Sequence, residues 1–306
     1  MRNTRKPLAL LFCFFLFTQL VYPQQEEPFR RRLSFKLTGG GGFALIGSIN
    51  RSLSLLNNND TFKDLRENDP DSISGELKGL NNWPADWEIE LRMDLSPKIS
   101  IGIAASAPYH CRKESSLSFA IFEDEKRGPR IKTLLYRPEA RVSIPIKLNL
   151  YYSRRYWKKP KLTLNAGIGY YPARLSQYSS SWIDTDWRST YWEVKAKFPI
   201  GIHGGVSLEY PLLKNLFLVA DIQARYIMLG NLQGRQEERG SDGTYYETNG
   251  TLYSFEFGDG SIPAYYDVLA IFETLEKALE YAGRVRNATL DLTGVILRVG
   301  LRLPLF

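Results

Sequence analysis

The sequence predicts an all-β fold: an eight-stranded antiparallel up-and-down transmembrane β-barrel with long extracellular loops and a helix in the last loop. Three observations predict it. Eight stretches alternate apolar and polar residues at every second position, as strands with one apolar face do. The links between these stretches alternate between short and long. Residues 1–23 have the pattern of an export signal.

The chain begins with a segment typical of a secretory signal peptide. A basic start at residues 2–6 precedes an uninterrupted apolar stretch at 8–17. This stretch is too short to cross a bilayer as a helix, so an uncleaved anchor is the less favoured alternative. We expect cleavage near Gln24, although Val21-Tyr22-Pro23 lacks the small residues of a usual site. The predicted domains are a signal peptide at 1–23, a short periplasmic N-terminal segment at 24–31 and a β-barrel domain at 32–306.

Charge, cysteine content and motifs argue against several classes of function. The chain has 40 basic and 33 acidic residues, and loss of the signal peptide leaves a net charge of about +4, which does not support nucleic-acid binding. Cys13 lies inside the apolar stretch, which argues against a lipoprotein anchor, and Cys111 alone forms neither an internal disulfide nor a metal cluster. The glycines at 39–42 lack a phosphate-loop lysine and are expected to allow curvature or close packing instead. We therefore expect no cofactor and no metal.

The predicted strands are stretches in which apolar side chains fall on one face and polar side chains on the other. A tilted strand needs about 9 to 11 residues to cross the apolar layer. The eight stretches cover residues 33–43, 87–95, 99–104, 141–152, 162–170, 198–210, 216–226 and 295–305. Pro145 lies inside the fourth stretch and removes one hydrogen-bond donor from its ladder.

The links separate a membrane barrel from a soluble β-sandwich, which eight amphipathic strands could also build. Short links alternate with long ones along the chain. The short links are 96–98, 154–160 and 211–215, and the long ones are 46–86, 108–137, 176–190 and 230–289. Outer-membrane barrels show this alternation, with turns on the periplasmic side and loops outside. Both termini are then expected in the periplasm.

Aromatic residues test this orientation, because membrane barrels carry aromatic girdles at both rims of the apolar belt. Phe43, Trp87, Tyr170 and Tyr226 fall at the predicted outer rim, and Tyr152 and Tyr210 at the inner rim. All six are in phase with the apolar set, which a soluble sandwich does not require. We expect them to form the girdles and to contact outer-membrane lipids.

The opposite face of the strands predicts a lumen rich in charge. The inward set is Lys36, Glu88, Glu90, Arg92, Asp94, Arg141, Lys147, His203, Glu209, Asp221, Arg225, Arg298 and Arg302. An eight-stranded barrel is just wide enough to be filled by side chains, and buried charges are costly unless they are paired. We therefore expect an ion-pair network that holds the barrel closed. A narrow solute channel through that network is the alternative.

Catalytic groupings are weak, so a non-enzymatic protein is favoured over a lipid-modifying enzyme. His203, Ser207 and Glu209 share one face of a strand and are the residue types that acyl transfer uses. On one strand, however, His203 and Ser207 lie about 13 Å apart, beyond hydrogen-bond reach. His110 and Cys111 are adjacent and should point to opposite sides of an extended chain. No catalytic residue is therefore assigned.

The chain stops at Phe306, directly after the last alternating stretch. The segment from Val295 to Phe306 resembles the terminal strand by which the assembly machinery recognises outer-membrane barrels. Together with the signal segment and the strand count, it makes the chain resemble the small eight-stranded outer-membrane barrels of the OmpA, OmpX and OmpW type. The resemblance covers residues 32–306 as architecture and carries no functional motif. It implies a bacterial outer-membrane location and recognition of the C-terminal strand by the barrel assembly machinery. A monomer is expected.

The long links hold much of the chain, so function is expected there. Apolar spacing predicts a helix over 266–284, which would cap the barrel mouth or offer a docking face, and a shorter helical piece over 52–56. Aromatic residues are dense in 178–192 and 245–255. They favour strands that continue as hairpins beyond the membrane, and contact with sugars or proteins is the alternative. Because function is expected in these links, we also expect an unidentified surface ligand or partner protein to bind there.

Overall fold

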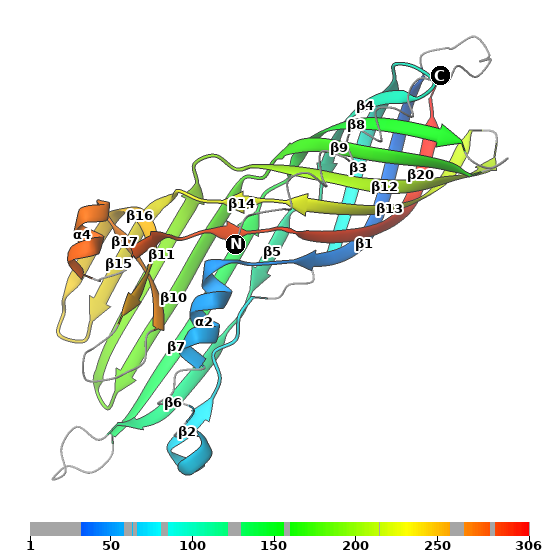
Figure 1. Ribbon diagram of the computed structural model, residues 1–306. Coiled ribbons are helices and arrows are strands. Elements are labelled where there is room, and N and C mark those ends of the chain that lie inside the picture. Colours follow the sequence, from blue (N-terminus) through cyan, green and yellow to red (C-terminus); the bar gives the residue numbers. More distant parts are fainter. Residues whose placement is uncertain are drawn as a thin grey trace, which may run out of the picture. The chain divides into compact units, whose positions relative to one another are not determined.

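The computed structural model describes residues 32–57, 63, 66–80, 85–121, 130–155, 160–213, 215–257, 266–281 and 285–305. Within this part the chain forms one compact unit that starts at Arg32 (Figure 1). The predicted signal peptide, the segment 24–31 and the terminal Phe306 lie outside the described residues.

Eight strands close into an antiparallel barrel, which confirms the predicted fold class (Figure 1). They are β1 (Leu33–Ala44), β3 (Ala85–Asp94), β4 (Ile99–Ser106), β8 (Ile146–Arg155), β9 (Lys161–Tyr170), β12 (Ile200–Leu213), β13 (Leu216–Tyr226) and β20 (Gly294–Pro304). Each pairs with the neighbours before and after it in chain order, and β20 pairs with β1 to close the ring. The barrel therefore has the up-and-down order that the alternating links predict.

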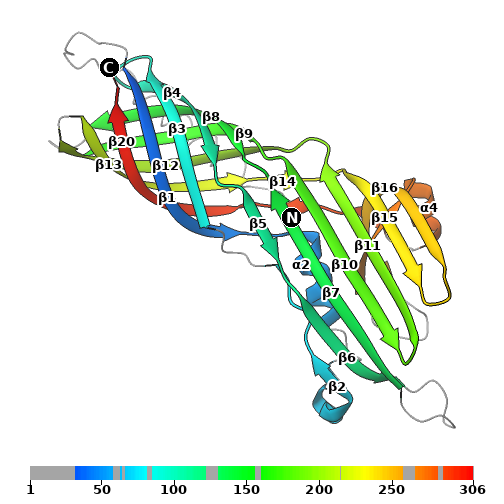
Figure 2. The ribbon, with the colours of Figure 1, turned by 180° about the vertical axis from the view of Figure 1, so that it is seen from behind.

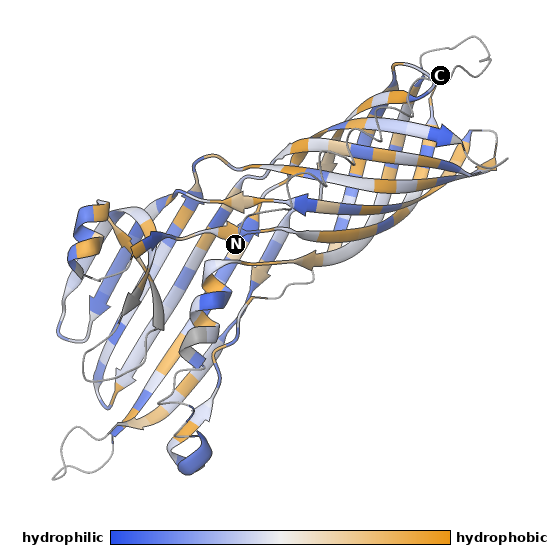
Figure 3. Cartoon of the chain, viewed as in Figure 1, coloured by the Kyte–Doolittle hydropathy of each residue, from blue (hydrophilic) through white to orange (hydrophobic). Residues whose placement is uncertain are grey.

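Burial alternates along the barrel strands as the pattern of residue types requires. On β3 the charged Glu88, Glu90 and Arg92 are buried, while Ile89 and Leu91 between them point outward and are exposed. Figure 3 shows the same alternation of hydrophobic and hydrophilic residues along the barrel strands. The barrel is thus polar inside and apolar outside, because successive side chains point to opposite faces.

The glycines at 39–42 bring β1 close to β20. A side-chain carbon at Gly40 would lie 1.9 Å from the carbonyl oxygen of Leu297, and one at Gly42 would lie 2.2 Å from that of Val295. Only glycine fits such an approach of two backbones. The close packing expected from the sequence is confirmed at these two positions.

The fourth predicted strand, 141–152, is wrong in its first residues. The barrel strand β8 begins at Ile146, and Arg141 and Val142 instead end β7 (Arg130–Val142), which belongs to a second sheet. Pro145 lacks an N–H, so the ladder breaks over residues 143–145 and the inward-outward phase shifts. As a result Arg141 is not in the lumen: its side chain is 58% exposed.

A ten-stranded sheet, here called the extension sheet, is built from all four long links (Figure 2). Its main path runs β17-β16-β15-β11-β10-β7-β6-β2, with β5 on β7 and β18 on β16. Besides β7, the strands are β2 (Ile73–Gly75), β5 (Tyr109–Arg112), β6 (Ser115–Ile121), β10 (Ala173–Ile183), β11 (Asp186–Ala196), β15 (Leu232–Gly240), β16 (Tyr245–Phe257), β17 (Tyr266–Phe272) and β18 (Val285–Asn287). The hairpins β10–β11 and β15–β16 confirm that the aromatic links continue as strands.

The extension sheet continues one side of the barrel wall. The barrel neighbours β13-β12-β9-β8-β4 run along the chain into β15, β11, β10, β7 and β5, which keep the same order in the extension sheet. Only two residues, Tyr171 and Pro172, separate β9 from β10. A short pair, β14 (Met228–Leu229) and β19 (Leu290–Asp291), similarly prolongs β13 and β20.

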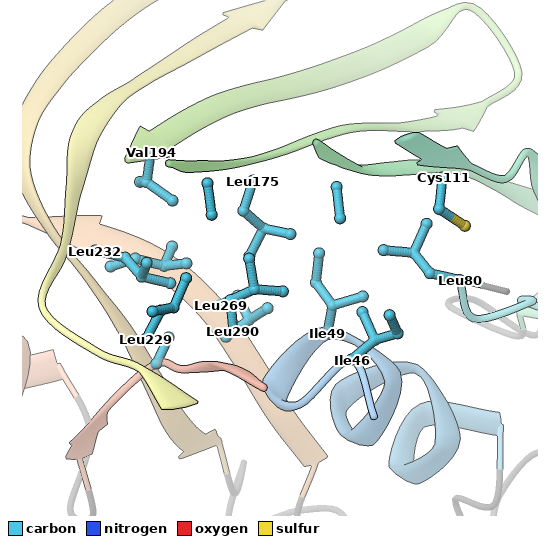
Figure 4. Close-up of a cluster of buried hydrophobic side chains, with 14 of the residues drawn as sticks. Ile46, Ile49, Leu80, Cys111, Leu175, Val194, Leu229, Leu232, Leu269 and Leu290 are labelled. Atoms are coloured by element: carbon cyan, nitrogen blue, oxygen red, sulfur yellow. The ribbon is translucent and has the colours of Figure 1, made fainter. Parts of the chain in front are cut away.

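A hydrophobic core lies against the inner face of the extension sheet (Figure 4). Leu175 and Val194 from the sheet belong to this core, as does Ile49 of helix α2 (Ser48–Asn57). The range of α2 includes the predicted helical piece 52–56. The segment that follows the short helix η2 (Pro70–Ser72) contributes Ile73 and Leu80 to this core. No helix in the described ranges is long and apolar enough to cross a membrane.

The helix predicted over 266–284 is replaced by a strand and a shorter helix. β17 covers Tyr266–Phe272 and helix α4 covers Leu275–Tyr281. Leu269 and Ile271 are buried at alternate positions, and β17 pairs with the free edge of β16. Sheet pairing therefore overrides the helical spacing. In α4 Ala278 is buried, whereas Leu275 and Leu279 are exposed.

Candidate functional site

The barrel lumen is the first candidate site, and the half of it nearer the extension sheet is organised around Glu88. This carboxylate lies 3.3 Å from the Lys36 ammonium, 2.5 Å from that of Lys147 and 3.3 Å from the Arg298 guanidinium. The four side chains come from β3, β1, β8 and β20 and are all almost fully buried. One carboxylate thus joins three cations across the barrel interior.

Arg298 extends this cluster with two further carboxylates. Its guanidinium lies 2.6 Å from Asp86 and 3.3 Å from Asp221, and it donates to the amide oxygen of Gln223 at 3.3 Å. Asp86 is absent from the predicted inward set. The alternation of Glu88, Glu90 and Arg92, extended by one step toward the N-terminus, would have included it.

Glu209 organises the lumen near the turn end of the barrel. It lies 3.0 Å from Arg92 and 2.9 Å from Arg302. Arg92 also donates to Ser100 and Ser153, each at 3.1 Å, and the Ser100 hydroxyl donates to Asp94 at 2.6 Å. Each charge in this cluster has an opposite partner, as buried charges require.

Tyr151 links the two lumenal clusters. Its hydroxyl donates to Glu90, and its ring lies 4.2 Å from the Arg92 guanidinium and 5.8 Å from the Lys36 ammonium. Glu90 is also 2.6 Å from Lys36. Sequence reasoning missed Tyr151 because an aromatic residue on the polar face of a strand does not stand out by charge.

We expect Tyr151→Phe to lower the free energy of unfolding by about 1 to 3 kcal/mol, because Glu90 loses a buried donor while the ring still covers Arg92. The adjacent Tyr152 points outward and is the matched control, for which Tyr152→Phe should change stability by less than about 0.5 kcal/mol. Urea titrations of both variants in the same lipid vesicles compare them. An equal change in unfolding free energy in the two variants would show that the hydrogen bond from Tyr151 to Glu90 does not stabilise the barrel.

Arg225 occupies the end of the lumen that adjoins the extension sheet. Its guanidinium donates to the carbonyl oxygen of Leu292 at 2.9 Å, and it lines a cavity of about 30 Å³ together with Lys147, Tyr109 and Tyr171. Burial raises the pKa of Tyr171 to about 12 and also raises that of Tyr109, so both phenols are neutral at physiological pH. The cavity is large enough for a water molecule or two.

The side chains considered for catalysis do not meet. His203 hydrogen-bonds the amide oxygen of Asn149, and the Ser207 hydroxyl donates to Asp221 at 2.9 Å. Glu209 is held by two arginines instead. In the extension sheet, His110 is exposed beside Glu139 while Cys111 is buried on the other face, as predicted for an extended chain. No group of His, Cys, Asp and Glu in the described residues is arranged to hold a metal ion.

The six aromatic residues expected in the girdles all lie on the outward face of the barrel. Trp87, Tyr170 and Tyr226 are 40%, 53% and 54% exposed at the end that adjoins the extension sheet, and Phe43 is half-buried at the same end. Tyr210 is 41% exposed, and Tyr152 is half-buried, near the opposite end. Their placement matches the two predicted rims.

The outward face of the extension sheet is the second candidate site. It contains a groove of about 360 Å³. The lining residues are Arg112, Arg137, Glu139, Arg141, Arg174, Ser176, Tyr178, Tyr191 and Glu193. Arginines outnumber carboxylates there by four to two, so the groove favours an anion. Sequence reasoning missed it because its residues lie on separate strands, in links treated as loops.

Neither a family model nor a curated protein matches this sequence. The fold resembles a major outer membrane protein of Thermus thermophilus (TM-score 0.37, 10% identity, covering 90% of this chain and 100% of that one). It also resembles the outer membrane protein OprG of Pseudomonas aeruginosa (TM-score 0.35, 8% identity, 90% and 97% covered). A third likeness is to the outer membrane protease OmpT of Escherichia coli (TM-score 0.35, 9% identity, 91% and 99% covered). At these scores none of the three transfers a function to this chain.

Proposed function

We propose that this chain is an integral protein of a bacterial outer membrane, exported through its N-terminal signal peptide and present as a monomer. The barrel is a closed anchor with a charge-filled lumen. The extension sheet stands outside the cell, and its surface contacts a ligand or partner. The protein acts without catalysis.

The polarity of the barrel carries this proposal. Leu148, Leu297 and Val299 on its outward face are 54%, 57% and 59% exposed, whereas Lys147 and Arg298 inside are each 2% exposed. Apolar side chains recur in this way on all eight strands. An apolar face that runs around the whole barrel is what lipid-facing strands require.

The lumen supports an anchor rather than a solute channel. Its cations and carboxylates are joined in close pairs, of which Arg298 with Asp86 and Lys147 with Glu88 lie nearest the extension sheet. The cavity at that end holds about 30 Å³, and the hydrophobic core around Ile227 and Leu292 lies next to it. A solute path would have to break several buried pairs at once.

The contacts of His203 and Ser207 also favour a non-enzymatic protein over a lipid-modifying enzyme. An acyl-transfer site needs its nucleophile within hydrogen-bond reach of a base. Here Ser207 donates to Asp221 inside a lumen that acyl chains on the outside of the barrel do not reach. The surface functions of contact and adhesion then fall to the extension sheet.

The C-terminal strand suits recognition by the barrel assembly machinery, the partner expected from the sequence. β20 presents Val295, Leu297 and Val299 outward at every second position, and all three are exposed. β20 also pairs with β1, the first strand of the chain to enter the barrel. Closure of the ring therefore depends on this strand.

The test is to fractionate cells that express the full chain and to run the outer-membrane fraction on a gel with and without boiling. We expect a band in that fraction whose mobility changes on boiling, because a closed barrel resists detergent until heated. A soluble periplasmic band with the same mobility in both lanes would overturn the membrane proposal.

A further inference from the structure

The lipid-facing side of the barrel continues directly into the outward face of the extension sheet. Along β9 and β10, Ile168, Tyr170 and Arg174 share one side of an almost unbroken strand, and each is exposed. Four residues of extended chain span roughly 13 Å, or about 10 Å along the membrane normal at the usual strand tilt. Arg174 thus lies just beyond the aromatic rim, at the level of lipid headgroups.

A basic row crosses three strands at this level. Arg141 of β7 is paired in register with Arg174 of β10, which is paired with Lys195 of β11. All three side chains are exposed on the outward face. Within the described part of the chain, neither Lys195 nor the groove residue Arg112 makes an ion pair.

Acidic residues in the next row hold the arginines in place without cancelling the charge. Glu139 accepts from Arg141 and faces His110, and Glu193 lies 3.1 Å from Arg174. Arg137 is likewise paired with Glu114 at 2.9 Å, so the excess positive charge of the groove comes from Arg112, with Lys195 beside it. Guanidinium groups arranged in this way match the oxygens of a phosphate, to which they donate pairwise.

Two tyrosines extend the groove away from the membrane. Tyr178 and Tyr191 are directly opposite each other on β10 and β11, and the Arg137 guanidinium lies 5.6 Å from the Tyr178 ring. The Tyr191 hydroxyl donates to Glu193 at 3.0 Å. Ring faces and hydroxyls beside cations suit a phosphorylated sugar better than a bare ion, because they add apolar contact and hydrogen bonds.

We propose that this face of β7, β10 and β11 binds the phosphorylated sugar headgroup of an outer-leaflet lipid. The phosphate sits on Arg141, Arg174 and Lys195, the sugar rests against Tyr178 and Tyr191, and the acyl chains follow the apolar belt below Tyr170. This inference rests on the proposed function, since embedding the barrel in a membrane brings the basic row to headgroup level and the proposed orientation places that row at the outer leaflet.

The test uses the full-length protein in detergent micelles and bisphosphorylated lipid A as the probe, with bound lipid counted by native mass spectrometry. We expect the triple variant Arg141→Gln, Arg174→Gln, Lys195→Gln to bind roughly tenfold more weakly or worse, because three charge-assisted contacts are lost. The control removes three positive charges elsewhere, through Arg188→Gln, Arg239→Gln and Lys277→Gln, and should bind as the unchanged protein does.

Two further probes identify the source of the phosphate. Lipid A without its phosphates should bind as weakly to the unchanged protein as intact lipid A does to the triple variant. Inorganic phosphate at equal concentration should not displace intact lipid A. Equal binding of the dephosphorylated lipid, full displacement by inorganic phosphate, or unchanged binding by the triple variant would each overturn the inference.

Boiling gels on every variant separate this inference from the proposed function. If the protein changes mobility on boiling but binds lipid A equally well with and without its phosphates, the headgroup site alone is overturned. A soluble protein with no change in mobility overturns the membrane proposal, and the headgroup site with it.

Discussion

We expect Glu88→Gln to lower the free energy of unfolding by about 3 to 5 kcal/mol, because it leaves buried cations without their shared counter-charge. Lys36, Lys147 and Arg298 all lie within 3.3 Å of this carboxylate, and Glu88 itself is 1% exposed. Glutamine has nearly the same shape, so the loss reports charge rather than a cavity. Urea unfolding in lipid vesicles, followed by the fraction of unboiled fast-migrating band, measures it.

A second substitution tests whether charge is the cause. Lys147→Met added to Glu88→Gln removes one of the stranded cations and should return part of the lost stability. Glu273→Gln on the exposed face of the last long link is the control, since its pair with Lys277 lies in water and should give no measurable change. A loss below about 1 kcal/mol for Glu88→Gln would contradict a lumen held together by ion pairs.

The barrel could be predicted from the sequence because an apolar outer face around a lumen of polar side chains imposes a strict pattern. Outward positions such as Ile101 and Ile103 must be apolar, and inward positions such as Ser100 and Gly102 need not be. The period of two therefore survives along every barrel strand. The short turns also constrain order, since strands joined by a few residues must be neighbours.

The extension sheet could not be predicted as a sheet because its outward face does not have to be apolar. Its strands therefore lack the strict alternation of the barrel strands. Its outward face carries Arg174, Ser176 and Tyr178 at successive alternate positions of β10. Its inward face is buried only because α2 packs against it, and α2 is distant in sequence. Strands of different links meet there, as β7 meets β10. Such long-range pairing leaves little trace in the local spacing of residues.

The wrong predictions have the same origin. Alternation that continues through 141–152 predicts Arg141 in the lumen, yet Pro145 interrupts the ladder and shifts the phase. The apolar residues of β17 also fit a helical spacing, and the free edge of β16 decides in favour of a strand. In both places a contact distant in sequence overrides a local pattern.

A charged residue placed at the centre of the apolar belt should distinguish most clearly between a belt that faces lipid and one that faces water. Val299 lies midway along the outward series of β20 and is 59% exposed. In a membrane, Val299→Arg should lower the free energy of unfolding by about 2 to 4 kcal/mol, because the guanidinium must enter the apolar layer. In a soluble protein the same change at an exposed position would shift stability by no more than about 0.5 kcal/mol.

Ile131 supplies the matched control within the same chain. It is 64% exposed near the far end of β7, beyond the basic row that the headgroup site requires. Ile131→Arg should leave both stability and the yield of heat-modifiable protein unchanged, because its side chain is already in water in the proposed orientation. If Val299→Arg and Ile131→Arg behave alike, the outward face of the barrel does not contact lipid, and the apolar belt must instead be covered by another protein.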